Sequence, residues 1–132
     1  MTTKFPKELF NIREAKGENH YYIMIVNEAL RDYQFKSQFP WFLHFDIIMK
    51  EVSKPFNLPT KKEAGILNSL EDRIKSVIKQ ILPYQFIGRT TENGHRELYF
   101  YVESPNKIHE ELNNFIQHGN LGRELEYSMV KD

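Results

Sequence analysis

Three segments of alternating side chains contain the groups in this sequence that could carry chemistry. In Trp41–Lys50 an apolar set alternates with a mixed set, and Tyr84–Thr91 and His95–Glu103 alternate in a similar way. Because successive side chains of a strand point to opposite faces of a sheet, the mixed sets should share one face. That face would carry imidazole, carboxylate, guanidinium and phenol groups, from Phe42, His44, Asp46, Gln85, Ile87, Arg89, Glu97, Tyr99 and Tyr101.

Such a face permits more than one interpretation. An open platform with Phe42, Tyr99 and Tyr101 would suit a protein interface, because tyrosine offers a large contact area at a low entropic cost. In the plainest interpretation the face is half solvated, and its polar groups only form cross-strand pairs such as Arg89 with Glu97. Polar residues that alternate along a strand need no further explanation than this.

An enzyme is the competing interpretation of the same side chains. It would use a pocket between the sheet and the N-terminal hairpin, lined by His44, Asp46, Arg89 and Tyr99. We take the strands at 41–50 and 96–103 as parallel neighbours, which would bring His44 or Asp46 close to Tyr99 or Tyr101. The sequence supports this hypothesis less well than a binding face, since it contains no catalytic motif.

Residue content excludes several kinds of catalytic and cofactor site. The chain has no cysteine, which excludes disulfides, thiolate nucleophiles and cysteine-based metal sites. It has no HExxH metal motif, no GxSxG nucleophile motif and no glycine-rich phosphate loop. We therefore expect no metal, no cofactor and no catalytic residue.

The charge balance bears on the class of partner. Eighteen basic residues balance eighteen acidic ones, which argues against general binding to nucleic acid or to an anionic membrane. Residues 96–102 are faintly similar to the third strand of RNA-recognition motifs, in which aromatic side chains stack on bases. The glycines of that motif are missing here, and Glu97 and Glu103 would repel phosphates. A single-stranded RNA-binding module is therefore the last of the alternatives.

Hydropathy argues against a membrane protein. The longest apolar runs, such as Tyr21–Val26, are far shorter than the roughly 20 residues that span a bilayer. The first ten residues lack the apolar segment of a signal peptide. We expect a cytoplasmic protein whose partner is another protein or a second copy of the chain.

Turn and cap residues divide the chain into elements. Residues 8–27 read as an N-terminal hairpin, with strands over Phe10–Ala15 and His20–Val26 around the turn-like residues 16–19. Asn27 would cap a short helix over Glu28–Phe35. The position of this hairpin relative to the other strands is left open.

A long helix follows the strand at Trp41–Lys50. Thr60 and Glu63 form a capping box, in which the Thr60 hydroxyl accepts from the Glu63 amide and the Glu63 carboxylate reaches back to the Thr60 amide. Apolar residues then recur at helical spacing until Pro83 ends the helix.

The last third of the chain predicts a hairpin, a helix and a strand. Asn93-Gly94 marks a tight turn between Tyr84–Thr91 and His95–Glu103. Ser104 offers an N-cap with Pro105 at the first helical position, and Gly119 ends that helix. Arg123–Val130 would be the closing strand.

From residue 41 this order is βαββαβ, the ferredoxin-like pattern. We therefore predict an α+β fold, with a four-stranded antiparallel sheet, both helices on one face and the N-terminal hairpin as an extension. Leu43, Phe45, Leu98 and Phe100 should point toward the helices. The whole chain, 1–132, would be a single domain with a ferredoxin-like core at about 41–131.

Two stretches resemble a known family. Residues 88–101, GRTTENGHRELYFY, and residues 58–63, LPTKKE, are similar to signatures of domain of unknown function family 695, a bacterial group. The resemblance covers roughly residues 20 to 130. It implies a relation in fold to the ribonuclease E inhibitor B group, whose ferredoxin-like members act by binding an enzyme, although those inhibitors tend to be acidic and this chain is neutral. The resemblance implies no catalytic residues, and it favours a non-enzymatic, protein-binding regulatory domain.

Overall fold

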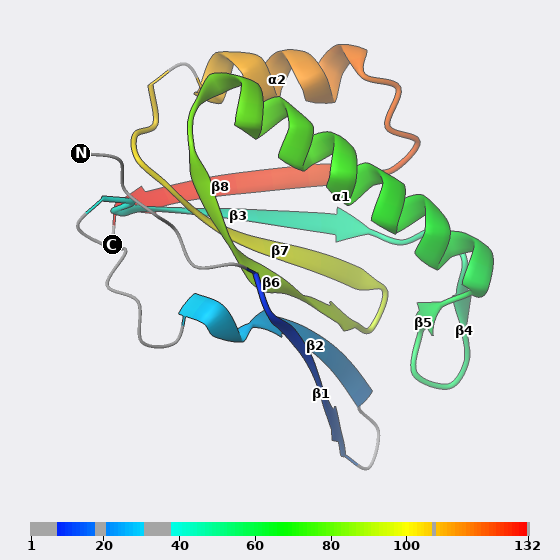
Figure 1. The fold of residues 1–132 in the computed structure, drawn as a ribbon. Helices are drawn as coiled ribbons and strands as arrows, with labels where there is room; N and C mark the ends of the chain where they lie inside the picture. The colour runs from blue at the N-terminus through cyan, green and yellow to red at the C-terminus, as the bar shows by residue number, and fades with distance from the viewer. Residues whose placement is uncertain (1–7, 18–20, 31–37, 107, 132) are drawn as a thin grey trace.

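The computed structural model describes residues 8–17, 21–30, 38–106 and 108–131, and it shows a mixed α+β fold on one six-stranded sheet (Figure 1). The strand order is β1-β2-β6-β7-β3-β8, and every neighbouring pair is antiparallel. The strands of this sheet are β1 (Phe10–Lys16), β2 (Tyr21–Asn27), β3 (Trp41–Ile48), β6 (Tyr84–Glu92), β7 (His95–Val102) and β8 (Leu125–Lys131). A separate short pair is formed by β4 (Val52–Ser53) and β5 (Leu58–Pro59).

Two helices, α1 (Lys61–Ile81) and α2 (Ile108–His118), lie on the same side of the sheet in Figure 1. Their buried side chains join those of the central strands in one apolar core. Leu43, Phe45, Leu98 and Phe100 are fully buried in this core, as the alternation predicted. Among the described residues, no helix has the length and apolar character needed to cross a membrane.

The strands β3 and β7 are antiparallel neighbours, so the parallel pairing expected from the sequence is wrong. Their register places His44 opposite Tyr99 and Asp46 opposite Glu97. The reason is the connection between β3 and β6. Because it passes through α1, β6 runs parallel to β3, and the two strands are separated by the width of one strand. The tight turn after β6 then brings β7 back into that space, antiparallel to both.

The N-terminal hairpin extends the sheet beyond β6, through the antiparallel pairing of β2 with β6. Buried Asn27 holds the end of β2 in place, because its side chain donates to the Phe86 carbonyl at 3.1 Å and accepts from the Leu9 amide at 3.1 Å. A 3₁₀ turn, η1 (Glu28–Leu30), follows. The remainder of the short helix predicted there, and part of the predicted turn at 16–19, lie outside the described residues.

The start of α1 confirms only half of the predicted capping box. The Thr60 hydroxyl accepts from the Glu63 amide at 3.2 Å, but the Thr60 amide donates to the Glu51 carbonyl. The fully buried Glu63 carboxylate instead accepts from Arg123 Nε at 2.7 Å and from the Lys50 amide at 3.1 Å. These bonds, led by the one to Arg123, lower the pKa of Glu63 despite its burial.

Local turn chemistry accounts for the remaining boundaries. Asn93 and Gly94 both have positive φ, 43° and 82°, as a tight hairpin turn requires. The second helix begins at Ile108 and not at Pro105, because Ser104 caps a preceding turn by accepting from the Asn106 amide at 3.0 Å. It ends at His118, before Gly119, as predicted.

Candidate functional site

Six of the predicted site residues lie together on the sheet face opposite the helices, which we call the open face. Each of the six is half-buried. The pairing of β3 with β7 sets them side by side. The open-face side chains are Phe42, His44 and Asp46 from β3, and Glu97, Tyr99 and Tyr101 from β7.

Aromatic rings form a continuous layer on the open face. The ring centroids of His44 and Tyr99 are 5.3 Å apart with an angle of 13° between the planes, and those of Phe42 and Tyr99 are 6.1 Å apart at the same angle. Tyr101 packs against Phe42 at 5.4 Å in a tilted arrangement. Such spacings lie in the range of favourable aromatic contacts, so the layer is held in a defined geometry.

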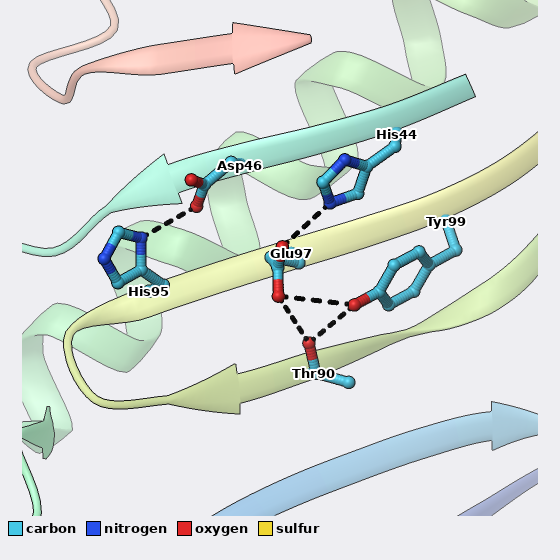
Figure 2. Close-up of polar contacts among 6 residues, drawn as sticks. All are labelled: His44, Asp46, Thr90, His95, Glu97 and Tyr99. Atoms are coloured by element: carbon cyan, nitrogen blue, oxygen red, sulfur yellow. Dashed lines mark hydrogen bonds and ion pairs between the residues drawn. The ribbon is translucent and has the colours of Figure 1, made fainter. Parts of the chain in front are cut away.

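A network of polar contacts lies beside this layer (Figure 2). His44 Nε2 is 2.9 Å from Glu97 Oε1, and because a carboxylate can only accept, Nε2 must carry the proton. The Tyr99 hydroxyl is 3.0 Å from Thr90 Oγ1, and both hydroxyls approach Glu97 Oε2 at 3.4 Å. Burial, assisted by the charge of Glu97, raises the pKa of the Tyr99 hydroxyl.

Two members of this network, Thr90 and His95, were missed by the sequence analysis. His95 Nδ1 is 3.0 Å from Asp46 Oδ1, and Thr90 lies directly opposite Glu97. The signal that could have found Thr90 is the two-residue turn at Asn93-Gly94, since it fixes which residues of β6 and β7 face each other.

Arg89 does not belong to the open face, and its predicted place there is wrong. The register of β6 against β7 shifts between Phe86 and Gly88, so that Ile87 is an extra residue and the alternation inverts. Arg89 therefore lies opposite core residue Leu98, and its Nη1 donates to both carboxylate oxygens of Glu71 on α1 at 2.9 Å. The predicted Arg89–Glu97 pair is wrong for the same reason, and Arg89 is not beside His44, Asp46 and Tyr99 as the enzyme hypothesis required.

Gly88 explains why the strand is irregular at this point. Its φ is 154°, and a Cβ placed on it would lie 2.1 Å from the Ile25 carbonyl oxygen. Only glycine permits this close approach of β2.

The open face has a covered end and an exposed flank. Leu30 and Phe39 are buried over Ile87 and Tyr101, which closes the face at that end. At the other side Val130 on β8 lies opposite Phe42 and is 59% exposed. The accessible part of the layer therefore runs from Tyr99 across Phe42 to Val130.

The chemistry available to this arrangement is limited. With Nε2–H directed at Glu97, His44 Nδ1 takes no part in that contact, and Ser128 lies opposite His44 on β8. In the described part of the chain, however, no hydrogen bond joins Ser128 to His44. A cavity of about 600 Å³ lies elsewhere, at the C-terminal end of α1, and none of the six open-face residues lines it.

Metal coordination finds no support either. In the described ranges, no group of three or more histidine and carboxylate side chains has the geometry to hold a metal ion. The two imidazoles of the open face each contact one carboxylate, in separate pairs.

Comparison with known families identifies a match over most of the chain. The model of a family of unknown function, DUF695, matches residues 13–132. No curated protein and no solved structure is significantly similar to the chain.

Proposed function

We propose that this chain, which belongs to the DUF695 family, is a non-enzymatic regulatory domain that binds another protein through its open face. The observation that carries this proposal is the layer of half-buried rings formed by Phe42, His44 and Tyr99, with Val130 exposed beside it. Contact surfaces are enriched in aromatic side chains, and rigid aromatic residues supply much of their binding energy.

The polar groups around the rings strengthen the case for a contact surface. A buried polar group is costly only when it loses its hydrogen-bond partner. Here the carboxylates of Glu97 and Asp46 already face His44 and His95, and the Tyr99 hydroxyl faces Thr90. A partner could therefore cover the layer without leaving these groups unsatisfied, and their fixed positions lower the entropic cost of binding.

We also propose that the core is ferredoxin-like and that the chain is a single domain. The order β3-α1-β6-β7-α2-β8, with the sheet order β6-β7-β3-β8, supports this assignment for residues 41–131. The hairpin β1–β2 would then be an addition at the β6 edge. Function does not follow from this fold, so the proposal depends on the open face alone.

A pair of matched variants tests the binding surface. Val130→Asp puts a charge on the open face, and Ile12→Asp makes the same change on β1, where Ile12 is 68% exposed on the opposite face of the sheet. Affinity capture from native lysate should recover a partner with the wild type and with Ile12→Asp, and lose it with Val130→Asp. Equal recovery with both variants would contradict the proposal.

Self-association through the same face is tested with the same proteins. Sedimentation velocity over a range of concentrations distinguishes a monomer from a reversible dimer. Dimerisation that Val130→Asp abolishes and Ile12→Asp preserves would identify the partner as a second copy. Dimerisation that only Ile12→Asp abolishes would place the contact on β1 and contradict an open-face interface.

A further inference from the structure

Two arginines lie close together on the helix-bearing face, away from the open face. Arg89 on β6 and Arg96 on β7 are on the same face of neighbouring strands, two positions apart in the register with the Thr90–Glu97 pair between them. Arg96 is only 5% exposed, and its Nε donates to Thr91 Oγ1 and its Nη1 to Asn68 Oδ1, each at 3.0 Å. Both partners are neutral, and no carboxylate in the described part of the chain forms an ion pair with Arg96.

The nearest carboxylate is already shared by other cations. Glu71 on α1 accepts from Arg89 Nη1 at 2.9 Å and from Lys75 Nζ at 3.0 Å. Together with Arg96, these side chains carry three positive charges and one negative charge. The cluster therefore has a net charge of +2 in a partly desolvated place.

Desolvation makes this excess charge effective. Burial, together with the nearby charge of Arg89, lowers the pKa of Arg96 to about 10, so that Arg96 still carries its proton at pH 7. A buried charge with neutral partners only is costly, and electrostatic attraction to an anion is stronger there than in bulk water. Binding of an anion would thus relieve the repulsion between the two guanidinium groups.

The cluster can be reached from solvent. The side chains of Arg89 and Lys75 are 22% and 23% exposed, and Asn68 is exposed on α1. In Figure 1 the hairpin β1–β2 extends the sheet past α1. Among the described contacts, Arg89 Nε and Nη2 and Arg96 Nη2 have no partner, so three donor nitrogens remain for a ligand.

We propose that Arg89 and Arg96 bind the phosphate group of a small molecule beside α1, where Arg89 and Lys75 are partly exposed. A phosphate carries a charge of about −1.5 to −2 at pH 7, which matches the net charge of the cluster. Its oxygens accept several charge-assisted hydrogen bonds, for which the planar guanidinium is the preferred donor. The site is separate from the open face and does not depend on the function proposed for it.

Titration calorimetry with inorganic phosphate and with O-phosphoserine, in a buffer of low ionic strength, measures this binding. We expect saturable binding that Arg89→Gln weakens about tenfold, since one charge-assisted contact is lost. Arg73→Gln is the matched control, because Arg73 is on α1 but is directed to the Gly119 carbonyl and the Phe115 ring. If O-phosphoserine binds more tightly than inorganic phosphate, the natural ligand is a phosphate ester; if the two bind equally, the ligand is free phosphate.

A third variant separates a binding site from a structural cluster. Glu71→Gln removes the carboxylate of the cluster and raises its net charge to +3, so phosphate should bind several-fold more tightly even if the protein becomes less stable. The Nε–H resonance of Arg96 should shift on titration with phosphate. Any of three results would overturn the proposal. The wild type does not saturate at roughly 10 mM phosphate. Arg89→Gln and Arg73→Gln weaken phosphate binding equally, or the Glu71→Gln variant binds phosphate more weakly than the wild type.

Discussion

Two roles for Glu63 predict different losses of folding stability when it is replaced by glutamine. As a helix-capping side chain Glu63 would contribute about 1 kcal/mol to stability. As observed, it is fully buried and pairs with Arg123, whose side chain is only 10% exposed. Removing one partner of a buried ion pair leaves the other charge uncompensated, which costs about 3 to 5 kcal/mol. The structure therefore predicts the larger loss.

Urea denaturation of the wild type and of Glu63→Gln gives the free energy of unfolding directly, and urea avoids the ionic screening that guanidinium would add. The double variant Glu63→Met/Arg123→Met should be more stable than Glu63→Gln, because it leaves no unpaired charge in the core.

The pH dependence of stability gives an independent check. The hydrogen bond from Arg123 holds the pKa of Glu63 in the folded state below the ordinary value of a glutamate carboxyl. The stabilisation is therefore complete above that value and is lost as the pH falls through the folded pKa. The difference in unfolding free energy between the wild type and Glu63→Gln should be constant from pH 6 to 8 and shrink in acid. A loss of only about 1 kcal/mol, or a difference that does not change with pH, would refute this account of Glu63.

Further results are expected for two glycines, for Asn27 and for RNA binding. In thermal unfolding, Gly88→Ala should destabilise the fold by more than about 3 kcal/mol, because the added Cβ would meet the Ile25 carbonyl oxygen. Gly65→Ala in α1 should instead stabilise the fold by about 1 kcal/mol, because a Cβ at this position meets no atom within 4 Å. Asn27→Ala should cost about 2 kcal/mol in urea unfolding, since it leaves the Leu9 amide and the Phe86 carbonyl without their partner. Single-stranded RNA should show no gel shift at low salt, because carboxylates flank the aromatic layer; a salt-sensitive shift that Tyr99→Ala removes would contradict this expectation.

Local patterns predicted the elements and the direction of the core side chains. The alternation in β3 and β7 correctly placed Leu43 and Phe100 toward the helices, because side-chain direction in a regular strand depends only on parity. Thr60 and Pro83 similarly bounded α1, since caps and breakers act within one turn.

Features that depend on distant segments escaped the sequence analysis. The bulge at Ile87 moved Arg89 from the open face to the helix-bearing face, and Gly88 beside it lies against the Ile25 carbonyl of β2. The partner of Glu63 is 60 residues away, so a local motif assigned its carboxylate to the wrong group. The antiparallel placement of β7 between β6 and β3 is likewise a property of the whole sheet.

The cover over one end of the open face was also beyond prediction. Leu30 and Phe39 pack over Ile87 and Tyr101, from a segment with only weak helical periodicity. Tyr101 therefore belongs to a small core more than to the accessible surface. The half-exposed part of the predicted site is then formed by Phe42, His44, Asp46, Glu97 and Tyr99.

Mapping the contact surface on the complex with a captured partner, or on the self-associated chain, tests the central claim most directly. Backbone amide shifts of the labelled protein should change along β3 and β8, around Phe42, His44 and Val130, and remain unchanged on β1 around Ile12. Shifts confined to β1 or to the outer surfaces of the helices, with β3 and β8 unaffected, would contradict the account.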